Sequence, residues 1–253
     1  MIDDALTRRT LLGVFFTLLP LAASAQGSLL DQGKALLGGV GGAGAGAGSG
    51  AKLSEGEIGG GLKDALKVAS QRVVGRVGKT DGFFGDPAIR VPLPGPLEQI
   101  AGPLKAVGAG GMLDDLQLKM NRAVEAAAPK ALDIFTGAVS KMSITDARGI
   151  LTGPKDAATQ YFRRTTSGDL TTAFRPIVDN SLANVGAVNA YKSVESKATS
   201  LPLAGSSLKG FNLTDFTVGK GLDGLFHYMA VEEDQIRTNP AARTTDLLKK
   251  VFA

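Results

Sequence analysis

The sequence predicts an all-α fold, arranged as a single compact bundle of several helices with no significant sheet. Three observations lead to this class. Apolar residues recur at helical spacing in most segments between residues 53 and 253. Capping signatures mark helix starts, as at Ser54–Glu57 and Ser143–Asp146. No run of alternating apolar and polar residues is long enough to require a sheet, and short connections favour antiparallel neighbours.

The first half of the domain is predicted to form a series of helices separated by glycine and proline. Gly78 is predicted to end the first of these helices. The alternative, a phosphate-binding loop at Gly78-Lys79-Thr80, is rejected because its pattern needs a glycine at position 73, which is valine, and a preceding strand. Gly102-Pro103 should kink or restart the second helix. The expected ranges are 54–77, 97–107, 113–127, 129–142 and 143–151.

A long loop is predicted over residues 80–96. Four prolines keep most of it out of helix, and residues 88–93 should be extended. Its apolar side chains are too many for a free loop, so we expect it to lie packed across the helices. Such a loop is either functional or a structural strap. These apolar side chains are Phe83, Phe84, Ile89, Val91 and Leu93.

The central stretch 150–170 begins the second half. Gly153-Pro154 predicts a turn, with Pro154 at the first position of a helix. Thr165–Gly168 is predicted to end that helix, and the next should start near Asp169 and bend at Pro176. A loop is expected over 200–213. The remaining helices are expected at 186–197, 214–237 and 241–252.

The N-terminus is typical of an export signal. Arg8-Arg9 precede an apolar run, and Ala23-Ser24-Ala25 resembles a cleavage site, so cleavage is expected after Ala25. The arginine pair also resembles a twin-arginine signal, although Asp3 and Asp4 offset its charge; an ordinary secretory route is the alternative. The expected organisation is an export signal over 1–25, a flexible glycine-rich linker over 26–52 and a helical domain over 53–253.

Composition narrows the possible functions. The chain has no cysteine, which excludes disulfides and thiolate metal sites, and its single histidine, His227, excludes a histidine-rich metal site. The net charge of +4 is scattered, and together with the export address this argues against nucleic-acid binding. No cofactor is indicated. The apolar run of the signal is too short to leave a stable membrane span in the mature chain, which places it in the periplasm or outside the cell.

The central stretch carries the first candidate site. Tyr161 and Phe162 lie on the apolar face of its helix, and Arg163 and Arg164 flank that face on opposite sides. Two arginines near a helix start rich in hydroxyl groups could hold a phosphate or a carboxylate. Alternatively, the aromatic residues are core anchors and the arginines pair with acids on neighbouring helices.

Two further segments complete the candidate ligand-binding set. Glu233 lies inside the apolar stripe of its helix, and a buried carboxylate must be paired or have its pKa raised. It is either a functional acid/base group or half of a buried salt bridge with Arg163, Arg164 or Arg243. The Arg243-Thr244-Thr245 segment repeats the combination of arginine with paired hydroxyls, and it could converge on the same anion or simply form local hydrogen bonds.

Several long motifs resemble one bacterial family, the "domain of unknown function 4197" proteins. The resemblance covers roughly residues 53–252, and it implies an exported bacterial protein with one helical domain. No catalytic residues follow from it. The motifs are GLKDALKVA from Gly61, GKTDGF from Gly78, DPAIRVPLPGPL from Asp86, MNRAVEAAAPKALDIF from Met120, ILTGPKDAATQYFRRTT from Ile150 and NPAARTTDLLKKVF from Asn239.

Three functions are compatible with these patterns. The first is a periplasmic binding or interaction module for a small anionic ligand or a protein partner, based on the arginine segments and the proline loop. The second is a cofactor-free hydrolase that uses Glu233 with Tyr161 or Tyr228 as acid/base groups. The third is a role in binding apolar ligands or a membrane surface, because helical bundles can open an apolar groove.

Overall fold

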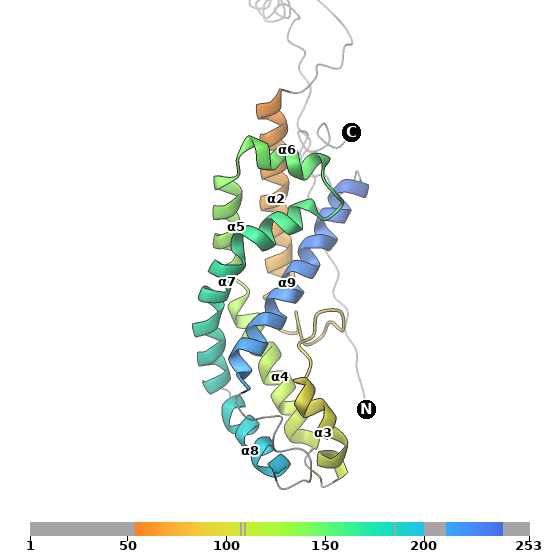
Figure 1. The fold of residues 1–253 in the computed structure, drawn as a ribbon, viewed down its shortest axis with the longest axis vertical. Coiled ribbons are helices and arrows are strands. Elements are labelled where there is room, and N and C mark those ends of the chain that lie inside the picture. Colours follow the sequence, from red (N-terminus) through yellow and green to blue (C-terminus); the bar gives the residue numbers. More distant parts are fainter. Residues whose placement is uncertain (1–53, 107, 109, 185, 200–210, 240–253) are drawn as a thin grey trace, which may run out of the picture. The chain divides into compact units, whose positions relative to one another are not determined.

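The structure is a computed structural model that describes residues 54–106, 108, 110–184, 186–199 and 211–239. All regular secondary structure in these residues is helical, which confirms the predicted all-α class (Figure 1). The helices are α2 (Glu55–Val77), α3 (Gly95–Ala106), α4 (Gly110–Ala127), α5 (Lys130–Lys141), α6 (Ile144–Thr152), α7 (Ala157–Asn184), α8 (Ala187–Thr199) and α9 (Leu213–Thr238). The expected signal, the linker and the helix at 241–252 lie outside the described residues.

The core forms where α7 and α9 pack along each other and against α4, with α2 and α5 completing the layer. Three phenylalanine rings meet at its centre. The Phe135 ring lies 4.9 Å from that of Phe162 and 6.2 Å from that of Phe226, measured between centroids. These contacts join α5, α7 and α9 in one apolar cluster, so the central stretch packs directly on the helix that carries Glu233.

The two capping boxes form as predicted. At α2 the backbone N–H of Ser54 donates to Glu57 at 2.8 Å, and the Glu57 N–H donates back to the Ser54 hydroxyl at 3.3 Å. At α6 the same exchange joins Ser143 and Asp146. Both helices therefore begin within a residue of the predicted positions, because a capping box depends only on residues that are neighbours in sequence.

The predicted break in α7 is wrong. The helix begins at Ala157 and runs without interruption through Thr165–Gly168 and Pro176. Hydroxyls that could have capped a break instead donate to carbonyls four residues back, as Thr166 does to Phe162 at 2.6 Å. Packing outweighs the weak local propensity, because one side of the helix is buried along its length. Its buried residues include Phe162, Thr166, Leu170, Phe174, Val178 and Leu182.

The Pro-rich loop (residues 80–94) packs against the helices, as predicted. Phe83, Ile89 and Val91 are each 5% exposed or less. Residues 88–93 were expected to be extended, but the structure shows that not all of them are. A turn continues through Ile89, where the N–H groups of Ile89 and Arg90 both donate to the Asp86 carbonyl. The loop therefore joins the core as a structural strap with a defined path.

Two glycines of α9 allow this close approach. A Cβ on Gly221 would lie 2.6 Å from Val124, and one on Gly224 would lie 2.6 Å from the Phe83 ring and 3.0 Å from the Ile89 Cβ. Gly219, on the same helix, has no atom within 4 Å of an added Cβ and is exposed. The glycines thus bring α9 into contact with α4 on one side and with the Pro-rich loop on the other.

Alanine at Gly224 is expected to lower the free energy of unfolding by about 1–3 kcal/mol, because the added methyl forces the Phe83 ring to move in a filled core. The matched change Gly219→Ala is expected to raise it by about 0.5–1 kcal/mol through helix propensity alone. Urea denaturation followed by circular dichroism measures both. Equal effects at the two positions would contradict the packing at Gly224.

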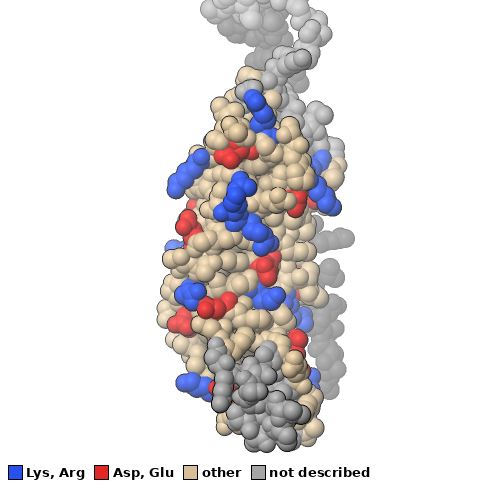
Figure 2. Space-filling model, viewed as in Figure 1, with Lys and Arg blue, Asp and Glu red and all other residues tan. Residues whose placement is uncertain are grey.

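No helix within the described ranges is long and apolar enough to cross a membrane. On the face shown in Figure 2, basic and acidic side chains are interspersed, with no extended area of one sign. This face therefore offers a charged ligand no broad surface of one sign.

Candidate functional site

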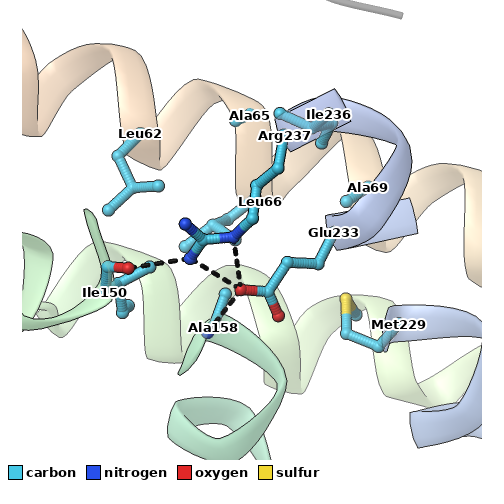
Figure 3. Close-up of a pocket in the computed structure, with 10 residues that line it drawn as sticks. All are labelled: Leu62, Ala65, Leu66, Ala69, Ile150, Ala158, Met229, Glu233, Ile236 and Arg237. Carbon is cyan, nitrogen blue, oxygen red and sulfur yellow. Dashed lines mark hydrogen bonds and ion pairs between the residues drawn. The ribbon is translucent and has the colours of Figure 1, made fainter. Parts of the chain in front are cut away.

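Glu233 caps the N-terminus of α7. One carboxylate oxygen accepts the Ala158 N–H at 2.9 Å, and the other accepts both the N–H and the hydroxyl of Thr159 at 2.9 Å. Arg237, one turn further along α9, donates to the first oxygen at 2.9 Å and to the Ile150 carbonyl at 2.7 Å (Figure 3). A carboxylate is favoured here because the first N–H groups of a helix have no partner within the helix.

This arrangement corrects the predicted partners of Glu233. The carboxylate is buried, as predicted, with its residue 6% exposed, but its cationic partner is Arg237 and neither Arg163 nor Arg164. Arg243 and Thr244 lie outside the described residues. The adjoining cavity is lined mainly by apolar side chains and has a volume of about 20 Å³, enough for roughly one water molecule. The arrangement therefore acts as a brace between α7 and α9.

The central arginines point to different surfaces. Arg163 faces α9, where it lies 3.7 Å from the Asp223 carboxylate and 4.6 Å from the centroid of the Phe226 ring. Arg164 faces α5 and α6, with its guanidinium 5.7 Å from the centroid of the Tyr161 ring. Tyr161 is buried and donates its hydroxyl hydrogen to the Ala138 carbonyl at 3.0 Å. The predicted ligand-binding set is therefore divided among three places.

A second buried carboxylate, which the sequence analysis missed, holds the Pro-rich loop. Glu125 on α4 accepts the N–H groups of Phe83 and Phe84 at 3.0 Å and pairs with Arg122 at 2.7 Å. One turn earlier, the Asn121 side chain accepts the Val91 N–H at 2.8 Å and donates to the Val91 carbonyl at 3.0 Å. Both residues are buried on α4, but helical spacing places them beside the apolar stripe of that helix and not inside it, so the reasoning that identified Glu233 does not reach them. They are buried because the Pro-rich loop packs over this side of α4.

A third contact joins the loop to α2 and α9. The Tyr228 hydroxyl donates to Asp86, and Arg76 donates to the Tyr228 oxygen at 2.7 Å and to Asp86 at 3.2 Å. The hydrogen bond from Tyr228 is the main reason that the pKa of Asp86 lies below its ordinary value. Burial is the main reason that the pKa of Tyr228 is raised. Loop, α2 and α9 are thereby held together at one point.

Tyr228→Phe is expected to lower the free energy of unfolding at neutral pH by about 1–2 kcal/mol, as for a hydrogen bond to a charged group. Because the folded pKa of Asp86 is depressed, its stabilisation is present above the unfolded pKa of about 3.9 and is lost as pH falls through the folded value. The difference in free energy of unfolding between the variant and the wild type should therefore become smaller at low pH. Urea denaturation across a pH series measures it, and a gap independent of pH would contradict the assignment.

A groove lies between the Pro-rich loop and α9. Its volume is about 300 Å³. Arg90 and Pro92 contribute from the loop, and Lys220, Asp223 and His227 contribute from α9. We call it the basic groove, because it holds two permanent cations, one histidine and a single acid. Within the described residues, no group of three or more histidine, aspartate or glutamate side chains is placed to hold a metal ion.

The comparisons with known proteins give one match. Residues 52–253 match the family described as "Protein of unknown function (DUF4197)". No curated protein and no solved structure matches the chain. The resemblance drawn from the motifs is confirmed, and it covers every residue of the helices described above. The chain belongs to the DUF4197 family.

Proposed function

We propose that this protein is an exported helical binding module that holds a small anionic ligand in the basic groove. The observation that carries the proposal is that cations from two separate elements line the groove while a third cation pairs with its one acid. Arg90 comes from the Pro-rich loop, Lys220 from α9, and Arg163 reaches the groove's acid from α7. Convergence of cationic side chains in a concave site is the arrangement that binds phosphates and carboxylates.

The one acid of the groove is already neutralised. Asp223 lies 3.7 Å from Arg163 and 3.7 Å from Lys220. The groove itself is lined by two permanent cations, Arg90 and Lys220, and Arg163 adds a third positive charge beside Asp223 from outside the lining. The remaining positive charge favours an anion, and the distances of 3.7 Å are long enough that an entering oxyanion can compete for the same donors.

The loop presents Arg90 in a fixed position. Its Nε donates to the Phe84 carbonyl at 2.6 Å, and its guanidinium lies 5.1 Å from the centroid of the Phe84 ring. Glu125, Asn121 and Tyr228 hold the loop from three sides. An arginine fixed in this way loses little conformational entropy on binding. A groove of about 300 Å³ suits an inorganic phosphate or a small carboxylate.

Isothermal titration of the purified protein with phosphate and with citrate tests the proposal. Arg90→Ala and Lys220→Ala are each expected to weaken binding about tenfold, because each removes roughly 1.5 kcal/mol of charge-assisted hydrogen bonding. Lys192→Ala is the matched control, an exposed lysine on α8 outside the groove. It should leave the affinity unchanged.

Equal loss of affinity in all three variants would mean that the anion responds to overall charge, and would contradict a site in the groove. Absence of binding to either anion by the wild-type protein would also contradict it. Export is tested separately, by sequencing the N-terminus of protein recovered from the periplasm. A mature chain beginning at Gln26 is expected, and a chain retained in the cytoplasm with residues 1–25 intact would oppose the export proposal.

A further inference from the structure

A second groove lies on the other side of α7, between α5, α6 and α7. Its volume is about 510 Å³, larger than that of the basic groove, and none of its lining residues is shared with that groove. The apolar part of its wall comes from Ile134, Gly137 and Ala138 of α5 and from Tyr161 of α7. We call it the dipolar groove, because two acids line one end, whereas two cations and a single acid line the other.

The positions of these charged residues follow from the way α5 packs against α7. The Tyr161 hydroxyl meets the Ala138 carbonyl at 3.0 Å. From there Asp169 lies two turns further along α7, about 12 Å. Along α5, Asp133 precedes Ala138 by more than a turn, whereas Lys141 follows it at the helix end. Figure 1 shows that α5 and α7 run in roughly opposite directions. Counted along each helix from the contact between Tyr161 and Ala138, Asp133 and Asp169 therefore lie towards one end of the groove, and Lys141 lies towards the end that holds Tyr161.

Arg164 belongs to the basic end. Its guanidinium lies 5.7 Å from the centroid of the Tyr161 ring. The one acid at this end, Asp146, accepts the hydroxyl of Ser143 at 2.6 Å and its N–H at 3.1 Å as part of the α6 capping box. Within the described residues, Asp133 and Asp169 make no ion pair. The charges at the two ends are therefore separated and not paired with each other.

We propose that the dipolar groove binds a short peptide with free termini, its ammonium group between Asp133 and Asp169 and its carboxylate at Arg164 and Lys141. Arg164 and Asp169 are separated by five residues of helix, about 7.5 Å. An extended tripeptide spans about 10 Å at most, so its termini reach both ends. The small residues Gly137 and Ala138 leave room for its side chains between the ends. This site is independent of the basic groove.

Isothermal titration calorimetry of the purified protein with trialanine tests the proposal. Saturable binding is expected. Acetylating the N-terminus of trialanine, or amidating its C-terminus, is expected to weaken binding about fivefold or more, the factor for losing one charge-assisted contact. The double variant Asp133→Asn/Asp169→Asn should lose discrimination against the acetylated peptide, and Arg164→Gln should lose discrimination against the amidated one.

Lys192→Ala is the control, because this exposed lysine of α8 lines neither groove and should leave trialanine binding unchanged. Absence of trialanine binding to the wild-type protein would overturn the proposal. So would equal binding of the free, acetylated and amidated peptides, a comparison that needs no folded variant. Putrescine binding as tight as trialanine would also overturn it, since the acidic end alone would then account for the interaction.

Discussion

Replacing Glu233 with alanine is expected to lower the free energy of unfolding by about 3–5 kcal/mol, the usual cost of breaking a buried ion pair by removing one member. The change removes the acceptor of two buried N–H groups at the start of α7 and the ion pair that this carboxylate makes with Arg237, whose side chain is 17% exposed. Thermal and urea denaturation followed by circular dichroism measure the loss.

Glu232→Ala is the matched control for this change. Glu232 is the preceding acid of α9 and pairs with Arg72 at 3.4 Å, with side chains 22% and 37% exposed. Its loss should cost under about 1 kcal/mol, as for other solvated pairs. If the two variants were equally stable, the capping role of Glu233 would be wrong. The hydrolase alternative stays a prediction; a Glu233→Gln variant that folds normally and loses an activity would favour it.

Replacing Glu125 with alanine is expected to lower the free energy of unfolding by about 2–4 kcal/mol, because it leaves two loop N–H groups unsatisfied and removes one of the two acids that pair with Arg122, the other being Asp81. The expected effect extends to binding. Arg90 is carried on the loop that Glu125 holds, so the variant should bind phosphate or citrate more weakly even under conditions where it remains folded. Calorimetry on the folded variant measures this second effect.

Glu125→Gln separates the two contributions. Glutamine keeps one acceptor oxygen for the loop N–H groups but carries no charge for Arg122, so its stability should lie between those of alanine and wild type. Anion affinity near that of the wild type is expected, because the loop stays in place. A Glu125→Ala variant that binds anions as tightly as wild type would show that the loop needs no such support.

Local signals in the sequence predicted local structure well. The capping boxes at Ser54 and Ser143 mark where α2 and α6 begin, because each box depends on residues three apart. The same reasoning failed inside α7. There Thr165–Gly168 has the composition of a helix end, but buried contacts made by Phe162, Thr166 and Leu170 with distant helices keep the chain helical.

In the candidate site, too, the features that depend on local sequence were predicted and those that depend on distant contacts were not. The apolar stripe of α9 correctly predicted that Glu233 is buried, because burial follows from helical periodicity. Its partners could not be predicted in the same way, since two of them are backbone N–H groups 74 and 75 residues away. The basic groove was missed for a related reason: Arg90 and Lys220 meet only because of the path that the Pro-rich loop takes.

An amide-resolved nuclear magnetic resonance titration of the wild-type protein with phosphate tests the central claim most directly. If the basic groove is the anion site, the amide signals of Arg90, Lys220 and His227 will shift together and saturate at one dissociation constant. Signals of the dipolar groove, such as those of Gly137 and Arg164, will stay in place. Shifts scattered over exposed lysines and arginines without saturation, or confined to residues outside the basic groove, would contradict the claim.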